Sequence, residues 1–223
     1  MPYTYDYSQP DEYHFSQDSI QMVEVVAKQF KDDFAKNMKD LSDIRVLDLC
    51  AGCGVIGIEL SWYLRELRII DFVEVQEVYE THFKKNVASV NRSELNLQFH
   101  LMNYEHILSP GEDSKWKNKY DLVLCNPHYF QVGQGKLSQS EFKKRCRFFI
   151  DSTFEKLILV ILHVLSTNGK AYLLHRPLKD HKLDLMNELD GILNSKACAR
   201  KIADIRGTDL ICIEKCQIAD ETQ

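Results

Sequence analysis

The stretch VLDLCAGCGVIG, residues 46–57, decides the fold predicted for this chain of 223 residues. It opens with an apolar run typical of a buried strand, and a run with helical spacing begins at Val55. Between the two lies the pattern G-x-G-x-x-G, formed by Gly52, Gly54 and Gly57. Glycines there let the backbone turn sharply and approach a ligand closely, because they carry no side chain. The stretch therefore predicts a strand, a ligand-binding turn and a helix in succession.

Outward from this stretch, hydrophobic spacing predicts alternating helices and strands. Helices are expected over 16–36, 55–67, 78–90, 154–165 and 183–193, and strands over 44–49, 69–73, 95–101, 120–125, 170–174, 197–205 and 209–216. Asn168-Gly169 is expected to stop the fourth helix, and residues 131–152 to form a mobile loop. The last two strands should pair as a hairpin around Arg206-Gly207-Thr208. Apolar strands alternating with helices predict an α/β fold whose mostly parallel sheet has helices on both faces.

Composition agrees with one globular core, since 44% of the residues are hydrophobic and 27% are charged. No apolar run approaches the roughly 18 residues that a membrane span needs, and the start MPYTYDYSQPDEY lacks the pattern of a signal peptide. We therefore expect a cytoplasmic protein that does not bind membranes. The net charge of −5 argues against indiscriminate binding to nucleic acid, but it does not exclude a local basic face.

Seven cysteines are an odd number, and in a reducing compartment they are expected to be free, buried thiols. Cys50 and Cys53 form a C-x-x-C pair, so metal or redox chemistry has to be weighed. No second pair with zinc spacing follows, and both cysteines lie inside the glycine-rich turn. We expect no metal site.

Two acidic residues bear on which nucleoside cofactor the turn would hold. Glu74 ends the second strand about 20 residues after Gly54, where a carboxylate can accept hydrogen bonds from both ribose hydroxyls. Asp48 lies just before the glycines, where a negative charge would repel the pyrophosphate of NAD. It suits a cofactor with an ammonium or sulfonium group. The pair favours S-adenosyl-L-methionine over NAD.

A second stretch, DLVLCNPHYF at residues 121–130, begins as a strand and stops at Asn126-Pro127. An exocyclic or amide nitrogen has a poorly available lone pair because it is conjugated. Acceptors on each N–H pull such an amine toward tetrahedral geometry. The side-chain carbonyl of Asn126 and the backbone carbonyl of Pro127 can act as these acceptors, since proline fixes its own φ. Tyr129 offers a face on which a flipped base can stack.

Taken together, DLCAGCGVIGIEL (48–60), FVEVQE (72–77) and DLVLCNPHYF resemble the class I S-adenosylmethionine-dependent methyltransferases of the Asn-Pro-Pro-Tyr type. YHFSQDS (13–19) and STFEKLILVILHVLSTNGKAYLL (152–174) are similar to the bacterial tRNA adenine-N6 methyltransferases of the tRNA1(Val) type. The resemblance spans roughly residues 9–216. It implies a Rossmann-like fold with a seven-stranded, mostly parallel sheet and a C-terminal antiparallel hairpin. Residues 1–40 would form a helical cap segment before a single domain at 41–223.

The predicted site has three parts. The catalytic residues would be Asn126, Pro127 and Tyr129. The cofactor would be bound by Asp48, Cys50, Gly52, Gly54, Glu74, Asn103 and Asn126, and the resemblance adds Phe15 and Ser16 as a cap on the pocket. Substrate RNA would be contacted by His128, Phe130, Lys143, Lys144, Arg145 and Arg147. For Phe130 a core role is an equal alternative, and for each basic residue alone a solvated helix face is the simpler interpretation.

Two positions depart from the family pattern. His128 replaces the second proline, so the loop loses rigidity and gains a titratable group. It would be inert, contact RNA phosphate or admit a differently shaped substrate. Asn103 stands where relatives carry an aspartate that holds the cofactor's adenine amine, and its carbonyl oxygen can still accept there.

The leading hypothesis is methylation of adenine N6 in RNA, most readily tRNA, by a monomer. A protein glutamine N5 or a guanine N2 in rRNA is the nearest alternative, because the same residues clamp those nitrogens equally well. Those enzymes usually carry an added recognition domain, which favours the tRNA enzymes modestly. A NAD-binding oxidoreductase and a catalytically silent adaptor are alternatives of a different class.

Overall fold

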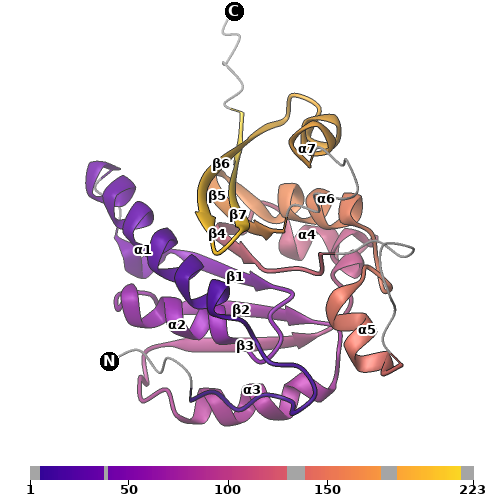
Figure 1. Cartoon of the computed structure of the whole chain (residues 1–223). Coiled ribbons are helices and arrows are strands. Elements are labelled where there is room, and N and C mark those ends of the chain that lie inside the picture. Colours follow the sequence, from indigo (N-terminus) through magenta and orange to yellow (C-terminus); the bar gives the residue numbers. More distant parts are fainter. Residues whose placement is uncertain (1–5, 38–39, 130–138, 177–184, 217–223) are drawn as a thin grey trace, which may run out of the picture.

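The structure, a computed structural model, describes residues 6–37, 40–129, 139–176 and 185–216 (Figure 1). The strands are β1 (Arg45–Leu49), β2 (Ile69–Glu74), β3 (Asn96–Leu101), β4 (Tyr120–Cys125), β5 (Leu165–His175), β6 (Ala197–Ile205) and β7 (Thr208–Lys215). The helices are α1 (Gln17–Asn37), α2 (Val55–Tyr63), α3 (Val78–Ala88), α4 (Asp113–Trp116), α5 (Glu141–Arg147), α6 (Phe154–Val164) and α7 (Leu185–Leu193). Short 3-10 helices lie at η1 (Leu41–Asp43) and η2 (Tyr104–Leu108).

The seven strands form one sheet in the order β3-β2-β1-β4-β5-β7-β6. The first five strands in this order, from β3 through β2, β1 and β4 to β5, are parallel to one another. Strand β7 pairs antiparallel with both β5 and β6. This confirms the predicted fold class. The strand order reverses between β1 and β4, and ligands of such sheets bind at the carboxyl ends of the strands beside the reversal.

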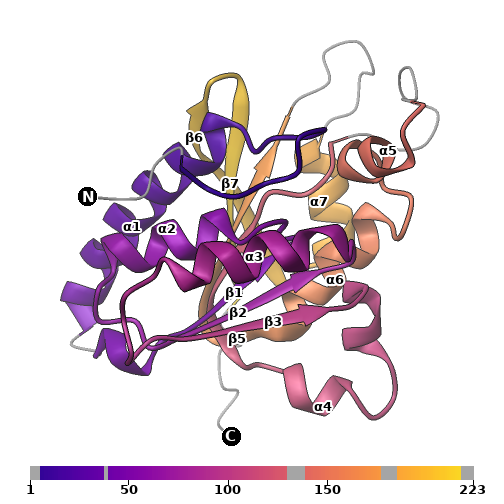
Figure 2. The same ribbon diagram turned by 90° about the horizontal axis from the view of Figure 1, so that it is seen from below.

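Successive residues of the strands feed two hydrophobic cores, one on each face of the sheet. Val46 and Leu122 face the core under α1, α2 and α3, whereas Leu47 and Val123 face the core under α4, α6 and α7 (Figures 1 and 2). Buried runs of this kind are typical of a sheet covered on both sides.

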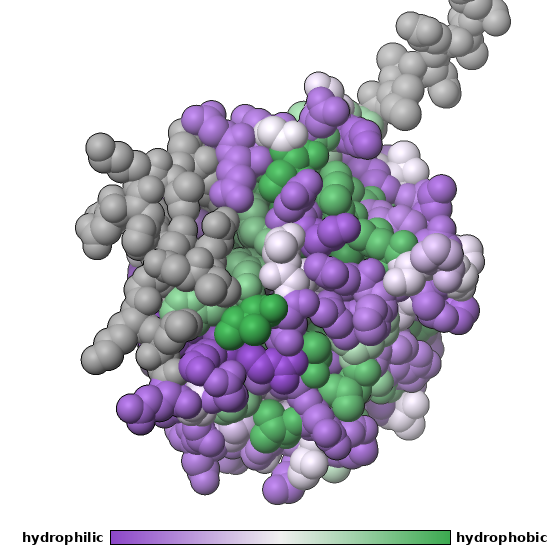
Figure 3. All heavy atoms as spheres, turned by 90° about the vertical axis from the view of Figure 1, so that its right-hand side faces the viewer, coloured by the Kyte–Doolittle hydropathy of each residue, from purple (hydrophilic) through white to green (hydrophobic). Residues whose placement is uncertain are grey.

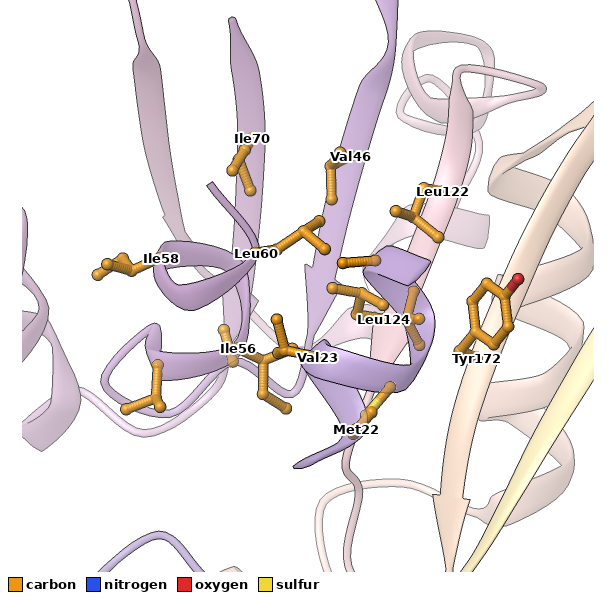
Figure 4. Close-up of a cluster of buried hydrophobic side chains, with 14 of the residues drawn as sticks. Met22, Val23, Val46, Ile56, Ile58, Leu60, Ile70, Leu122, Leu124 and Tyr172 are labelled. Carbon is orange, nitrogen blue, oxygen red and sulfur yellow. The ribbon is translucent and has the colours of Figure 1, made fainter. Parts of the chain in front are cut away.

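Helix α1 is part of the first of these cores. Its Met22 and Val23 are fully buried and pack toward Ile56 of α2 and Leu124 of β4 (Figure 4). Residues ahead of the glycine-rich stretch therefore help to build the domain. The division at residue 41 into a cap segment and a single domain remains a proposal.

Gly169 does not stop a helix, so that prediction was wrong. Helix α6 ends at Val164, and β5 begins at the next residue, Leu165. Gly169 lies within β5 opposite an irregularity in β4, where a Cβ atom would come 2.8 Å from the backbone carbonyl oxygen of Tyr120. A glycine is needed there because two strands approach closely.

The segment 131–152 was predicted as a loop, but its second half contains helix α5. The hydroxyl of Ser140 caps this helix by accepting from the backbone N–H of Lys143. The Phe142 ring packs against Tyr79 of α3. A short polar helix of this kind has too few regularly spaced hydrophobic residues to be predicted from the sequence. It is stabilised by packing against the rest of the protein, which the local sequence does not reveal.

The predicted C-terminal hairpin is confirmed. Strands β6 and β7 are joined by Arg206 and Gly207, whose φ angles are +55° and +79°. Two successive residues with positive φ form the tight turn that matches the twist of paired strands. Helix α2 differs slightly from prediction, because it ends at Tyr63 rather than Leu67.

Candidate active site

A cavity of about 210 Å³ opens at the carboxyl ends of β1 and β4. It is lined by the glycine-rich turn, the end of β2, residues 126–129 after β4 and part of the N-terminal segment. Figure 3 views this end of the molecule and shows mostly hydrophilic side chains interrupted by separate hydrophobic spots. The sequence-predicted site and the cavity therefore coincide in their main parts.

A second, smaller hollow lies beside the first, between the ends of β2 and β3. Val75, Met102 and Asn103 line it, and Cys50, Glu74 and His128 line both hollows. The free volume of the smaller hollow is about 20 Å³, room for roughly one water molecule, so an aromatic ring would enter it only if the surrounding side chains moved.

The glycine-rich turn has the backbone geometry that the sequence predicted. Gly52 and Gly54 have φ angles of +54° and +82°. A Cβ atom on Gly54 would lie 2.6 Å from the Phe83 ring, and one on Gly57 would lie 2.5 Å from the Phe72 ring. Gly54 therefore serves both a left-handed conformation and close packing on α3, and Gly57 lets α2 lie against β2.

Glu74 lies where the prediction put it and is almost fully buried. One carboxylate oxygen accepts from the backbone N–H of Gly52 at 2.9 Å, and the other accepts from Val75 and Gln76 at 2.9 Å each. Burial raises the pKa of this carboxyl group, and the three backbone donors oppose the rise. Oε2 accepts one of these bonds and retains a lone pair for a ribose hydroxyl, whereas Oε1 already accepts two.

Asp48 is fully buried and lines neither hollow. Its Oδ2 accepts from the backbone N–H of Gly57 at 2.8 Å, and its Oδ1 has no hydrogen-bond partner. Burial is the main cause that raises its pKa to about 8, and the charge of Glu74 adds to the rise. Asp48 would therefore influence cofactor binding indirectly, because its hydrogen bond to Gly57 helps to hold the glycine-rich turn in shape.

Asn103 lines the small hollow and caps η2. Its Oδ1 accepts from the backbone N–H of Glu105 at 2.9 Å, and its Nδ2 donates to the backbone carbonyl of Asp151 at 2.7 Å. An aspartate could not make the second bond, because it has no donor when ionised. Asn103, which stands in place of the family's aspartate, thus links the end of β3 to the segment after α5.

The side chain of Asn126 is held at both ends. Its Nδ2 donates to Ser19 Oγ at 2.8 Å, and its Oδ1 accepts from the Tyr129 hydroxyl at 2.6 Å. Pro127 is buried in the cavity wall, and the guanidinium of Arg176 lies 5.9 Å from the centre of the Tyr129 ring. The three predicted catalytic residues are therefore together at the end of β4.

The model of the methyltransferase small domain family matches residues 32–173. The chain belongs to this family. It is an S-adenosylmethionine-dependent methyltransferase, so the alternative of a NAD-binding oxidoreductase is excluded.

Individual relatives of this methyltransferase are distant. It is 28% identical over 126 residues to the tRNA1(Val) (adenine(37)-N6)-methyltransferase of Flavobacterium psychrophilum, which covers 56% of this chain and 50% of that protein. It is 27% identical over 135 residues to the type II methyltransferase M.AccI of Acinetobacter calcoaceticus, covering 58% of this chain and 23% of that protein. The chain thus aligns with half or less of the length of these relatives.

The fold is shared with solved methyltransferases. The SAM-dependent methyltransferase from Agrobacterium tumefaciens superposes with a TM-score of 0.59 at 12% identity, over 90% of this chain and 63% of that one. The residues present fit S-adenosylmethionine: the glycine turn gives backbone access, and Glu74 suits the ribose. When bound, this cofactor supplies a methyl group activated by the positive charge on its sulfur.

The remaining predicted residues of this methyltransferase are distributed unevenly. Phe15 and Ser16 line the main cavity. His128 forms part of the wall between the two hollows, where its ring packs edge-to-face against Phe149. Burial lowers the pKa of His128, so its imidazole is neutral at neutral pH. Phe130 lies outside the described residues.

The predicted RNA-binding residues Lys143, Lys144, Arg145 and Arg147 all lie on α5. Lys144 is in an ion pair with Glu141, and Arg145 donates to both carboxylate oxygens of Asp151 at 2.8 Å. The positive charge of Arg145 slightly opposes the rise of the Glu74 pKa on burial. Because Asp151 lines the small hollow, its ion pair brings Arg145 of α5 near the cofactor side of the site.

Several residues of the site were missed by sequence reasoning. Gln76 and Tyr79 follow β2, and both contact the thiol of Cys146 on α5 at 3.4 Å. Ser19, in the first turn of α1, was not predicted as part of the site either. The signal available for Gln76 and Tyr79 was their position directly after Glu74, because residues that follow parallel strands gather at the same edge.

The N-terminal residues 6–16, here called the N-terminal strap, cross α3 before they reach the cavity. Asn86 of α3 exchanges two hydrogen bonds with the backbone of Ser8, and its Nδ2 also donates to the carbonyl of Cys53 at 2.9 Å. The Tyr7 hydroxyl donates to Glu59 of α2 at 2.8 Å. One side chain, Asn86, thus ties the strap to the glycine-rich turn.

The described residues contain no helix long and apolar enough to cross a membrane.

Proposed function

We propose that this methyltransferase methylates the N6 amine of adenine in RNA, with tRNA as the favoured substrate, as a cytoplasmic monomer. The observation that carries the proposal is the position of Asn126 and Pro127 at the end of β4, in the wall of the same cavity as Glu74. The partial similarity to a tRNA1(Val) (adenine(37)-N6)-methyltransferase supports it.

In this proposal the protein acts mainly by placement. The Asn126 side-chain carbonyl and the Pro127 backbone carbonyl would accept one N–H each from the target amine and free its lone pair. That lone pair would bond to the methyl carbon as the bond from this carbon to sulfur breaks, and S-adenosylhomocysteine would leave. The methylated amine would be cationic and would then lose its proton to solvent water, so no strong base is required. Proximity and fixed dipoles of this kind are major sources of rate enhancement.

The entrance of the cavity favours a nucleic acid over a protein glutamine. Tyr13, His14 and Tyr129 line the cavity, and Arg176 lies over the Tyr129 ring. The positive charges of Arg147 and Arg176 also reach the Tyr13 phenol, where both oppose the rise of its pKa on burial. Aromatic rings for bases beside guanidinium groups for phosphates are typical of proteins that bind single-stranded RNA.

The identity of the substrate is tested by incubating the protein with methyl-labelled S-adenosylmethionine and either total RNA or total protein. We expect label in the RNA, recovered after digestion to nucleosides as N6-methyladenosine. Label recovered as N2-methylguanosine or in protein glutamine would replace this proposal by one of its alternatives. If RNA is bound through phosphates, transfer should also fall steeply with added salt while cofactor affinity stays nearly constant.

The role of Asn126 is tested by Asn126→Ala. We expect binding of S-adenosylhomocysteine, measured by calorimetry, to be retained and methyl transfer to be nearly abolished. Asn96→Ala is the matched control, because this exposed asparagine lies at the amino end of β3, opposite the cavity. Loss of cofactor binding together with transfer would assign Asn126 to the fold instead.

A further inference from the structure

The C-terminal hairpin carries two cysteines at its open end, opposite the tight turn. Cys198 lies in β6, the last strand of the sheet, and Cys216 directly follows β7 (Figure 1). Their Sγ atoms are 3.2 Å apart. Both thiols are free, as the sequence predicted, but Cys198 is exposed and Cys216 is only partly buried. The prediction of burial was therefore wrong for this pair.

Strand pairing holds the backbones of the two cysteines in place. Cys198 lies directly opposite Glu214 in the antiparallel ladder, and Cys216 follows Glu214 by two residues, so the three side chains share one face of the sheet. The backbone N–H of Cys216 donates to the carbonyl of Lys196 at 3.0 Å, which extends the ladder beyond β7. The contact between the sulfur atoms is thus set by the register of the hairpin.

The two sulfur atoms are close enough to be joined by rotation of the side chains. A disulfide bond is about 2.05 Å long, so the sulfur atoms need to approach each other by about 1.2 Å. Rotation about a Cα–Cβ bond moves a sulfur atom by this amount, and exposed side chains rotate on short timescales. The ladder between β6 and β7 can therefore stay intact when the bond forms.

Cys198 is also the cysteine that solvent reaches most easily. All seven cysteines lie in the part of the chain that the structure describes, and Cys198 alone among them is exposed. A hydrogen-bond contact with Cys198 raises the pKa of the Cys216 thiol, which keeps the proton on Cys216 while Cys198 attacks. The charge of Glu214 opposes a thiolate only weakly, because Lys170 pairs with it at 2.7 Å.

We propose that Cys198 and Cys216 are a redox modification site: a disulfide forms between them reversibly and staples the hairpin when the protein meets a small disulfide such as oxidised glutathione. In a reducing compartment the ordinary state is the dithiol. The proposal is independent of which substrate is methylated.

The reaction consists of two thiol–disulfide exchanges. The Cys198 thiolate bonds to one sulfur of oxidised glutathione, the S–S bond of the oxidant breaks, and one glutathione thiolate leaves. The Cys216 thiolate then bonds to the Cys198 sulfur and displaces the second glutathione thiolate. The protons of the two protein thiols end on the two glutathione molecules, so the protein is oxidised and glutathione is reduced. An excess of reduced glutathione reverses both steps.

The first test treats the full chain with oxidised glutathione and measures its intact mass. We expect the loss of two hydrogen atoms, and a protease digest in which the segments that contain Cys198 and Cys216 are joined. Reduced glutathione should restore the original mass. A chain that keeps all its thiols, that retains bound glutathione, or that forms a dimer linked through Cys198 would overturn the proposal.

Two single variants test the order of the steps, and both change the open edge of the sheet, where folding tolerates substitution. In Cys216→Ser the second exchange is impossible, so Cys198 should retain one glutathione. In Cys198→Ser the thiol that reacts first is missing, so Cys216 should stay reduced. Loss of two hydrogen atoms in either variant would overturn the pairing.

The staple should also stabilise the fold. A covalent bond across the hairpin restricts the unfolded chain, and we expect the midpoint of thermal unfolding to rise by about 5–10 °C. Cys198→Ser is the matched control, because the oxidant should leave its midpoint unchanged. Methyl transfer should be equal in both redox states, since Thr208, which meets Asp18, lies at the other end of the hairpin. Equal midpoints for the oxidised and reduced chains would overturn the role as a staple.

Discussion

At the scale of single residues, Gly54 and Gly191 give opposite predictions for the same substitution. Gly54→Ala places a side chain at φ +82° and 2.6 Å from Phe83, whereas Gly191 lies in α7 with nothing within 4 Å of an added Cβ. We expect Gly54→Ala to lower the free energy of unfolding by about 2–4 kcal/mol. Gly191→Ala should raise it by about 0.5–1 kcal/mol, because alanine favours a helix. Urea unfolding followed by circular dichroism measures both, and equal stability of the two variants would contradict the prediction.

Asp48 predicts a dependence on pH. Its pKa is about 8 in the folded chain against an ordinary 3.8, so the folded state holds a proton that the unfolded state releases above about pH 4. Its contribution to stability is therefore complete below about pH 4 and is lost as the pH rises toward 8. Asp48→Asn removes this dependence. The stability of the variant relative to wild type should rise across this window by up to about 1.4 kcal/mol per pH unit.

The control for Asp48 is the comparison of the two proteins at each pH, since other groups titrate equally in both. His175 is one such group: burial lowers its pKa to about 4, so its contribution is complete above about pH 6.5 and is lost as the pH falls toward 4. A difference between variant and wild type that does not change with pH would show that Asp48 is ionised in the folded protein.

The positions of some site residues could be predicted from the sequence, namely those set by the local backbone or by the end of a strand. Gly54, Glu74 and Asn126 lie where they were predicted, because each follows from its position along one element. Ser19 could not be assigned, since it is 107 residues from Asn126 and neither segment specifies the other. The interior position of Asp48 was equally hidden, because the direction of a side chain at the end of a strand depends on the helix packed against it.

At the scale of elements, α5 changes the expected role of Arg145. Its two bonds to Asp151 hold the segment whose backbone carbonyl accepts from Asn103 in the small hollow. We expect Arg145→Ala to weaken the binding of S-adenosylhomocysteine by about threefold to tenfold, a modest effect because the pair is partly exposed. Calorimetry would measure it.

Lys143→Ala is the control for α5, since it removes a charge from the same helix without touching Asp151. We expect it to leave cofactor affinity unchanged and to weaken RNA binding. If Arg145→Ala binds the cofactor normally and only RNA binding falls, Arg145 is a phosphate contact as the sequence suggested.

The strands and long helices were predictable because their apolar residues recur with a clear period. Helix α5 and the start of β5 were not. In β5 the pair Asn168-Gly169 resembles a helix stop, yet Gly169 is there because β4 passes 2.8 Å from where its Cβ would be. A glycine is suited both to the end of a helix and to a close contact between strands. Only the position of the neighbouring strand, which the local sequence does not give, distinguishes the two.

At the scale of the whole molecule, α1 predicts that the shorter chain 41–223 cannot fold alone. Met22, Val23 and Val26 are fully buried, and Phe30 is nearly so. Each such side chain contributes about 1.5–3 kcal/mol, so their joint loss approaches the roughly 5–15 kcal/mol that stabilises a typical domain. We expect the fragment to lack a cooperative thermal transition in calorimetry. A fragment that unfolds cooperatively and binds S-adenosylhomocysteine would show that residues 1–40 are dispensable.

The contact between α1 and the C-terminal hairpin has a consequence for biosynthesis. Asp18 meets Thr208 across 190 residues, and Gln17 meets Arg206 in the turn of the same hairpin. During synthesis the hairpin emerges long after α1, because the rest of the sheet lies between them in the sequence. The first helix, whose Ser19 contacts Asn126, therefore waits for the hairpin before its contacts with Thr208 and Arg206 can form. A nascent chain that still lacks the hairpin would hold the amino end of α1 less firmly against the site.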